Sequence, residues 1–172
     1  MLKKPAQFFF YGNYFYGCCT VALAIEASMQ QNLPLNSLYF YLLLYFGTVL
    51  FYTYAYIKER DTRFINNRNQ WYKKNRKLIQ KMQWILIPVC MVITLILCIK
   101  NYSSFQNITL LQLLPLAVTG LTAVSYYGVS IGGSAQINIR KTGWFKPFAI
   151  GLVWATAVTY VPVLWYQVER NS

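Results

Sequence analysis

The stretch SLYFYLLLYFGTVLFYTYAYI at residues 37–57 contains 21 residues without a charge, and it decides the fold class. An apolar helix of about 20 residues can cross the hydrocarbon core of a bilayer, so this stretch predicts a transmembrane helix. The next stretch, KERDTRFINNRNQWYKKNRKLIQKMQ at residues 58–83, is strongly basic, and WILIPVCMVITLILCI at residues 84–99 is apolar again. Apolar runs that alternate with a basic loop indicate a membrane protein with several spans.

The composition of the whole chain agrees with this prediction. Of its 172 residues, 56% are hydrophobic and only 12% are charged, which is half of the roughly 25% found in soluble domains. Disordered chains are poor in apolar residues, so this composition also excludes disorder. The sequence has no histidine, which removes Ser-His and Cys-His nucleophiles and histidine ligation of metals.

We therefore expect an all-α fold, a bundle of about five transmembrane helices that forms one integral membrane domain over residues 1–172. The expected spans cover residues 8–29, 37–57, 84–99, 108–127 and 147–166. Within loop 58–83, residues 69–83 predict an amphipathic helix that lies in the cytoplasmic interface. Its apolar face carries Trp71, Leu78 and Met82.

The basic residues orient these spans. If five spans alternate, 14 of the 16 Lys and Arg residues fall on one side, at the N-terminus and in loops 58–83 and 128–146. Loops rich in Lys and Arg stay in the cytoplasm, so the sequence predicts a bacterial inner-membrane protein with a cytoplasmic N-terminus. The net charge of +12 then reflects membrane orientation, and we expect no nucleic-acid partner.

Loop 58–83 also supplies the candidate binding residues. Five cations of this loop are candidates for holding the phosphate of a lipid or of a diphosphate: Arg68, Lys73, Lys74, Arg76 and Lys77. The alternative is that these residues act only as a topology signal and attract anionic headgroups. The expected partners are therefore the bilayer and its anionic headgroups, with an isoprenoid as a further candidate ligand.

Two polar residues inside the first span are candidates of another kind. Glu26 is the one acid within a predicted span, and acids inside a membrane are often functional. Asn13 is expected to hydrogen-bond across helices. The four cysteines all lie in apolar runs without a C-x-x-C spacing, and we interpret them as small core-facing or lipid-facing residues.

Five stretches of the chain resemble the UbiA-type membrane prenyltransferases, in particular the short, divergent UbiA-like proteins of Bacteroidetes-type bacteria. They are FFFYGNYFYG at 8–17, VALAIEA at 21–27, TVLFYTYAYI at 48–57, NQWYKKNRKLI at 69–79 and GWFKPFAIGLVWATAVTYVPVL at 143–164. The resemblance implies an all-helical fold with a cytoplasmic loop after the second helix. In active members that loop carries an N-x-x-x-D-x-x-x-D motif, which binds magnesium and an isoprenyl diphosphate.

The chain departs from this family at that motif. Only Glu59 and Asp61 follow the second span, and they point to different sides of a helix, so Asp61 is the one candidate metal ligand. Family members build about nine spans, whereas this sequence predicts five. We therefore expect a truncated or non-catalytic relative, and if the protein is active, a magnesium-dependent prenyltransferase. No catalytic residue can be assigned.

Two further functions remain open. The chain also fits a non-catalytic structural or accessory subunit of a membrane complex, since it lacks a catalytic constellation. A small transporter would need polar residues along an aqueous path, for which Glu26, Asn13, Gln112 and Thr119 are the candidates.

Overall fold

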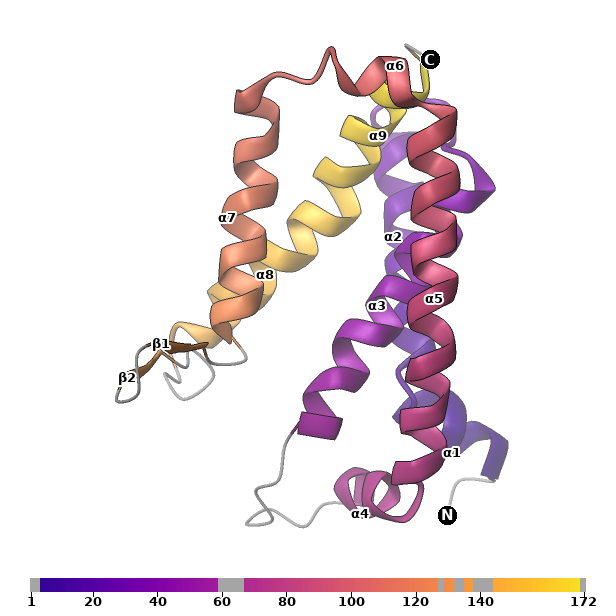
Figure 1. Ribbon diagram of the computed structural model, residues 1–172, viewed down its shortest axis with the longest axis vertical. Coiled ribbons are helices and arrows are strands. Elements are labelled where there is room, and N and C mark those ends of the chain that lie inside the picture. Colours follow the sequence, from indigo (N-terminus) through magenta and orange to yellow (C-terminus); the bar gives the residue numbers. More distant parts are fainter. Residues whose placement is uncertain (1–3, 59–66, 127–128, 132–134, 138–143, 171–172) are drawn as a thin grey trace. The chain divides into compact units, whose positions relative to one another are not determined.

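The computed structural model describes residues 4–58, 67–126, 129–131, 135–137 and 144–170, and almost all of them are helical (Figure 1). The helices are α1 (Lys4–Tyr11), α2 (Tyr14–Gln30), α3 (Leu38–Lys58), α4 (Asn67–Lys74), α5 (Arg76–Lys100), α6 (Tyr102–Phe105), α7 (Leu110–Tyr126), α8 (Lys146–Ala155) and α9 (Val161–Arg170). A π-helical segment, η2 (Thr156–Tyr160), joins α8 to α9. The predicted helical fold class is confirmed, with one exception in the loop between the last two predicted spans.

That exception is a pair of short antiparallel strands, β1 (Val129–Ile131) and β2 (Ala135–Ile137). Val129 pairs with Ile137 and Ile131 pairs with Ala135. Both strands lie within the loop expected at residues 128–146, for which the sequence predicts no strands. β-branched residues at both ends of the pair favour an extended backbone.

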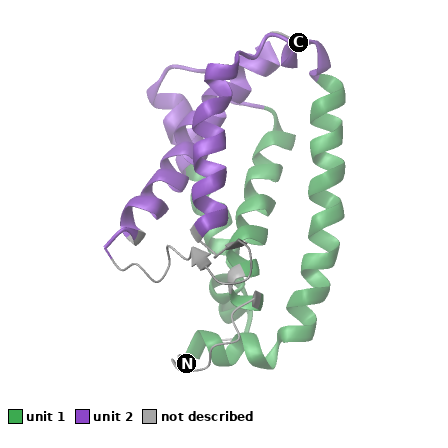
Figure 2. Ribbon diagram, turned by 60° about the vertical axis from the view of Figure 1, so that its left-hand side comes forward, with its two compact units in different colours: residues 1–22, 37–100 green, residues 23–36, 101–172 purple. Residues whose placement is uncertain are grey.

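Contacts within the chain divide it into two compact units (Figure 2). Unit 1 comprises residues 1–22 and 37–100, and unit 2 comprises residues 23–36 and 101–172. The sequence alone predicts one membrane domain and gives no sign of this division. Each unit is described separately.

By length and composition, two stretches of the described residues can cross a membrane, Arg76–Lys100 and Pro147–Arg170. The pair α1 and α2 becomes a third if it counts as one bent span. The apolar helical stretches Leu38–Tyr54 and Leu110–Ser125 are shorter. Each of the five predicted spans therefore corresponds to helical structure, and the five-span bundle stays a prediction.

Two predicted elements are divided differently in the structure. The first span, expected over residues 8–29, is broken between α1 and α2 with a bend of 56°. The interfacial helix expected over residues 69–83 is also wrong as one element, because a turn at Asn75 ends α4. Residues from Arg76 onward instead belong to α5, a continuous helix of 25 residues.

In unit 1, α3 packs against α5. Val49 of α3 and Ile79, Ile93 and Leu97 of α5 are buried in this unit. The helices α1 and α4 contact each other, and both lie at the end of unit 1 where α5 begins (Figures 1 and 2). This end carries the candidate site.

In unit 2, α7 packs against α8 and η2. The π-helical segment ends just before Pro162, which lacks a backbone N–H and whose ring crowds the carbonyl four residues earlier. A wider helical turn relieves that crowding. We attribute η2 to Pro162 for this reason.

Candidate functional site

The site begins at the break between α1 and α2. Asn13 has a left-handed backbone, with φ of 67°, which stops the helix because most side chains avoid this conformation. A Cβ atom on Gly12 would lie 2.5 Å from the Phe8 carbonyl oxygen and 2.8 Å from the Tyr14 ring. Glycine at position 12 and asparagine at position 13 are therefore the local cause of the 56° bend.

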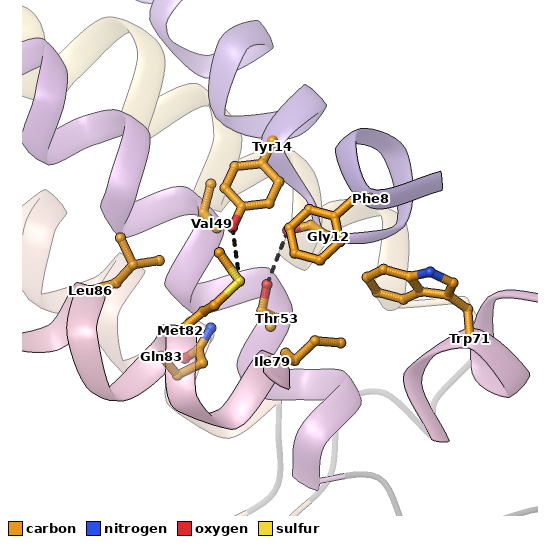
Figure 3. A pocket seen from close by; sticks show the side chains of 10 residues that line it. All are labelled: Phe8, Gly12, Tyr14, Val49, Thr53, Trp71, Ile79, Met82, Gln83 and Leu86. Carbon is orange, nitrogen blue, oxygen red and sulfur yellow. Dashed lines mark hydrogen bonds between the residues drawn. The ribbon is translucent and has the colours of Figure 1, made fainter. Parts of the chain in front are cut away.

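A helix that ends in an apolar environment leaves carbonyl groups without partners, and here side chains supply those partners. The Tyr72 hydroxyl donates to the Tyr11 carbonyl at 2.8 Å, and Arg68 Nη2 donates to the same oxygen at 3.3 Å. Thr53 Oγ1 lies 3.4 Å from the Gly12 carbonyl and donates to it (Figure 3). Both carbonyls at the break are thus bonded by residues of α3 and α4.

The side chain of Asn13, which is fully buried, joins the same residues together. Its amide nitrogen donates to Thr53 Oγ1 at 3.0 Å and to the Tyr72 hydroxyl at 2.9 Å. Its Oδ1 accepts a hydrogen bond from Arg68 Nη2. We call Asn13, Thr53, Arg68 and Tyr72 the break cluster, since they bring α2, α3 and α4 together at the helix break.

The charge of Arg68 is stabilised within the break cluster by dipoles and rings. Its Cζ lies 4.3 Å from the centroid of the Tyr56 ring, and the Tyr56 ring stacks on Tyr72 at 4.6 Å with 9° between the planes. The last carbonyls of α1 form the negative end of a helix dipole, which favours a cation. Burial raises the pKa of Tyr72 to about 12, so its hydroxyl keeps the proton that it donates to Tyr11.

The structure separates the five predicted phosphate-binding cations into two sets. Arg68 turns inward to the break cluster, whereas the other four are exposed: Lys73, Lys74, Arg76 and Lys77. We call these four residues the basic corner. They flank the turn at Asn75, whose backbone N–H and side-chain amide both donate to the Trp71 carbonyl, at 3.0 Å and 2.9 Å. Hydrogen bonds therefore hold the backbone of the turn that the basic corner flanks.

A small pocket lies beside the break cluster in unit 1 (Figure 3). Phe8, Gly12 and Tyr14 line it from α1 and α2, and Trp71 and Met82 are among the residues that line it from α4 and α5. Its cavity volume is about 10 Å³, which is room for about one water molecule. This pocket is too small to enclose an isoprenoid.

Of the predicted acidic candidates, only Glu26 lies among the described residues. Glu26 is exposed on α2 and accepts a hydrogen bond from the Gln30 amide at 3.0 Å. Asp61 and Glu59 lie outside the described residues. Within the described part of the chain, no three His, Cys, Asp or Glu side chains gather as a metal site would require, and the four cysteines there are free thiols.

Two candidates for a transport path lie in unit 2, where they bond between helices. Thr119 Oγ1 lies 2.9 Å from Thr156 Oγ1, and the Tyr160 hydroxyl donates to the Gln112 carbonyl at 2.7 Å. The Gln112 side-chain amide donates to Gln167 at 3.1 Å. These bonds link α7 to η2 and α9, as polar residues between membrane helices commonly do.

Sequence reasoning missed the roles of Thr53, Tyr56 and Tyr72. None of the three is singled out from the sequence, and Thr53 lies within the apolar run at residues 37–57. The Gly12–Asn13 pair was the available signal, because both residues tolerate backbone conformations that end a helix. No match to this chain is found among protein families, curated proteins or solved structures.

Proposed function

We propose that the protein is a bacterial inner-membrane protein with five spans and a cytoplasmic N-terminus, which binds anionic phospholipid headgroups at its basic corner. The observation that carries this proposal is the position of Lys73, Lys74, Arg76 and Lys77. They are exposed at the end of α4 and the start of α5, and one further lysine, Lys81, follows before α5 becomes apolar. Cations at this position meet the headgroup phosphates of a bilayer that α5 crosses.

The length of α5 fits this position. Its 25 residues make a helix of about 38 Å, which exceeds the roughly 30 Å hydrocarbon core by enough to place its basic end among the headgroups. Trp84, just past the last lysine of this end, is 76% exposed. Tryptophan side chains are enriched at the membrane interface, because their amphipathic rings suit the level of the headgroups.

A phospholipid fits better than an isoprenyl diphosphate. Both ligands offer phosphate oxygens to the basic corner, but a bound isoprenoid also needs an apolar enclosure for its chain. The pocket beside the break cluster, with a cavity volume of about 10 Å³, does not supply one, whereas the acyl chains of a phospholipid remain in the bilayer. The proposal assigns no prenyl transfer and no magnesium to the described residues, and the UbiA-like ancestry remains an expectation.

Native mass spectrometry of the purified protein tests this proposal. Phosphatidylglycerol should bind more tightly than phosphatidylcholine. Replacing two cations of the basic corner, K73Q with K77Q, should weaken phosphatidylglycerol binding about 30-fold, because each cation near an anionic surface contributes about 1 kcal/mol. The matched control, K100Q with R170Q, removes the same charge elsewhere and should leave binding unchanged.

Three outcomes would overturn the proposal. They are equal binding of the two lipids, equal loss in the control, and preferential binding of a soluble isoprenyl diphosphate. The same spectra test the accessory-subunit alternative, because a partner subunit that co-purifies at a fixed ratio would appear as an added protein mass.

A further inference from the structure

The helix α1 presents an aromatic face that the break cluster does not use. Phe9, Phe10 and Phe15 are 39%, 43% and 41% exposed, and their rings contact one another, with centroids 5.3 Å apart for Phe9–Phe10 and for Phe10–Phe15. The opposite side of α1 is docked, since Phe8 and Tyr11 contact the Trp71 ring of α4 at 5.5 Å and 5.8 Å. Three clustered phenylalanines thus face outward. Phe9 and Phe10 belong to α1, which is held in place, and Phe15 belongs to the start of α2.

A contact within unit 1 shows which part of α5 lies beside the break between α1 and α2. The Tyr14 hydroxyl, at the start of α2, lies 3.7 Å from Met82 Sδ (Figure 3). Met82 follows Lys81, the last cation before the apolar part of α5, and precedes the exposed Trp84. The break between α1 and α2 therefore lies level with the boundary between headgroups and acyl chains that these residues of α5 mark.

The bend determines how far α1 extends from that boundary. Its eight residues make a helix about 12 Å long. At 56° to α2, this helix advances only about 7 Å along the α2 axis. The headgroup layer on each side of the bilayer is about 5–7 Å thick. When α2 runs along the bilayer normal, α1 therefore stays within this layer.

We propose that α1 is an interfacial helix that lies in the cytoplasmic headgroup layer, and that Phe9 and Phe10, together with Phe15 at the start of α2, insert toward the acyl chains. This inference depends on the membrane orientation in the proposed function, but not on a preference for anionic lipid. The occupant of the aromatic face is the lipid itself. Lys4 on α1 and the basic corner beside it match the negative charge of that surface, and the hydrogen bonds of the break cluster fix the angle of the helix.

Photo-crosslinking of the full chain in liposomes tests this inference. The photoreactive amino acid p-benzoylphenylalanine, placed at position 10 or 15, should yield a covalent lipid adduct that mass spectrometry detects. Leu95, which is 57% exposed in the apolar part of α5, provides the positive control, and a sample of each variant that is not irradiated provides the negative control. Two positions are used so that misfolding of one variant does not decide the result.

Lipid adducts at positions 10 and 15 in both phosphatidylcholine and phosphatidylglycerol liposomes would support the inference. Adducts to a second protein chain would overturn it, as would no lipid adduct at either position when Leu95 gives one. These results are separable from lipid preference in the native spectra, so either proposal can fail while the other stands.

Discussion

Asn13 is the residue on which the described structure of unit 1 depends most. It ends α1 by its left-handed backbone, and its side chain bonds Thr53, Tyr72 and Arg68. The sequence could predict that a buried asparagine in a span bonds to another helix. It could not predict the partners, because they follow 40, 55 and 59 residues later in the chain.

Replacing Asn13 by alanine should lower the free energy of unfolding by about 2–4 kcal/mol, since it removes the buried hydrogen bonds from Asn13 to Thr53, Arg68 and Tyr72 and strains the backbone. Thermal unfolding in detergent measures this loss. The matched control is N32A, because Asn32 also has a left-handed backbone, with φ of 53°, but is exposed. We expect the control to lose only the backbone contribution, about 1 kcal/mol. Equal losses would show that the break cluster adds nothing to stability.

Arg68 shows why residue type alone does not identify a binding site. The sequence groups it with Lys73, Lys74, Arg76 and Lys77 because all five are cations in one loop. The structure instead turns it to the carbonyl end of α1 and to the ring of Tyr56. A guanidinium bonds several acceptors and stacks on a ring at once, which suits it to an interior that an ammonium group fits less well.

At the scale of the element, the break in the first predicted span is the main departure from the sequence prediction. Hydropathy averages over a window, and the apolar run from Phe8 to Met29 contains one Gly12–Asn13 pair that such an average conceals. The long helix α5 was easier to predict, since its apolar part is continuous. Its start was misplaced because Lys77 and Lys81 suggested a separate interfacial helix.

Substituting Gly12 by alanine tests the break directly. The added methyl group would meet the Phe8 carbonyl and the Tyr14 ring, so we expect unfolding to become easier by about 1–3 kcal/mol. Gly47 of α3 is the control, because a Cβ there meets nothing within 4 Å. G47A should be neutral or stabilising by up to about 1 kcal/mol, as for a helical glycine with open space at its Cβ position. Thermal unfolding of both variants compares them, and a stable G12A protein would contradict the close packing at the break.

At the scale of the whole molecule, the strongest prediction from sequence is the distribution of charge. Fourteen of 16 basic residues fall on one side if five spans alternate. Hydropathy and charge are local properties, so they predict helices and their orientation. The division into two units depends on contacts between residues far apart in the sequence, so local sequence patterns do not predict it.

The lipid site and the interfacial position of α1 both require that α5 crosses the membrane with its basic end in the cytoplasm. Cysteine labelling tests this claim, in a variant whose four natural cysteines are replaced and which carries either K77C or K100C. A maleimide that cannot cross membranes should label K100C in spheroplasts and K77C only in inverted membrane vesicles. Labelling of both positions from the same side would show that α5 does not cross the bilayer, and would contradict the proposed lipid site and the interfacial position of α1 together.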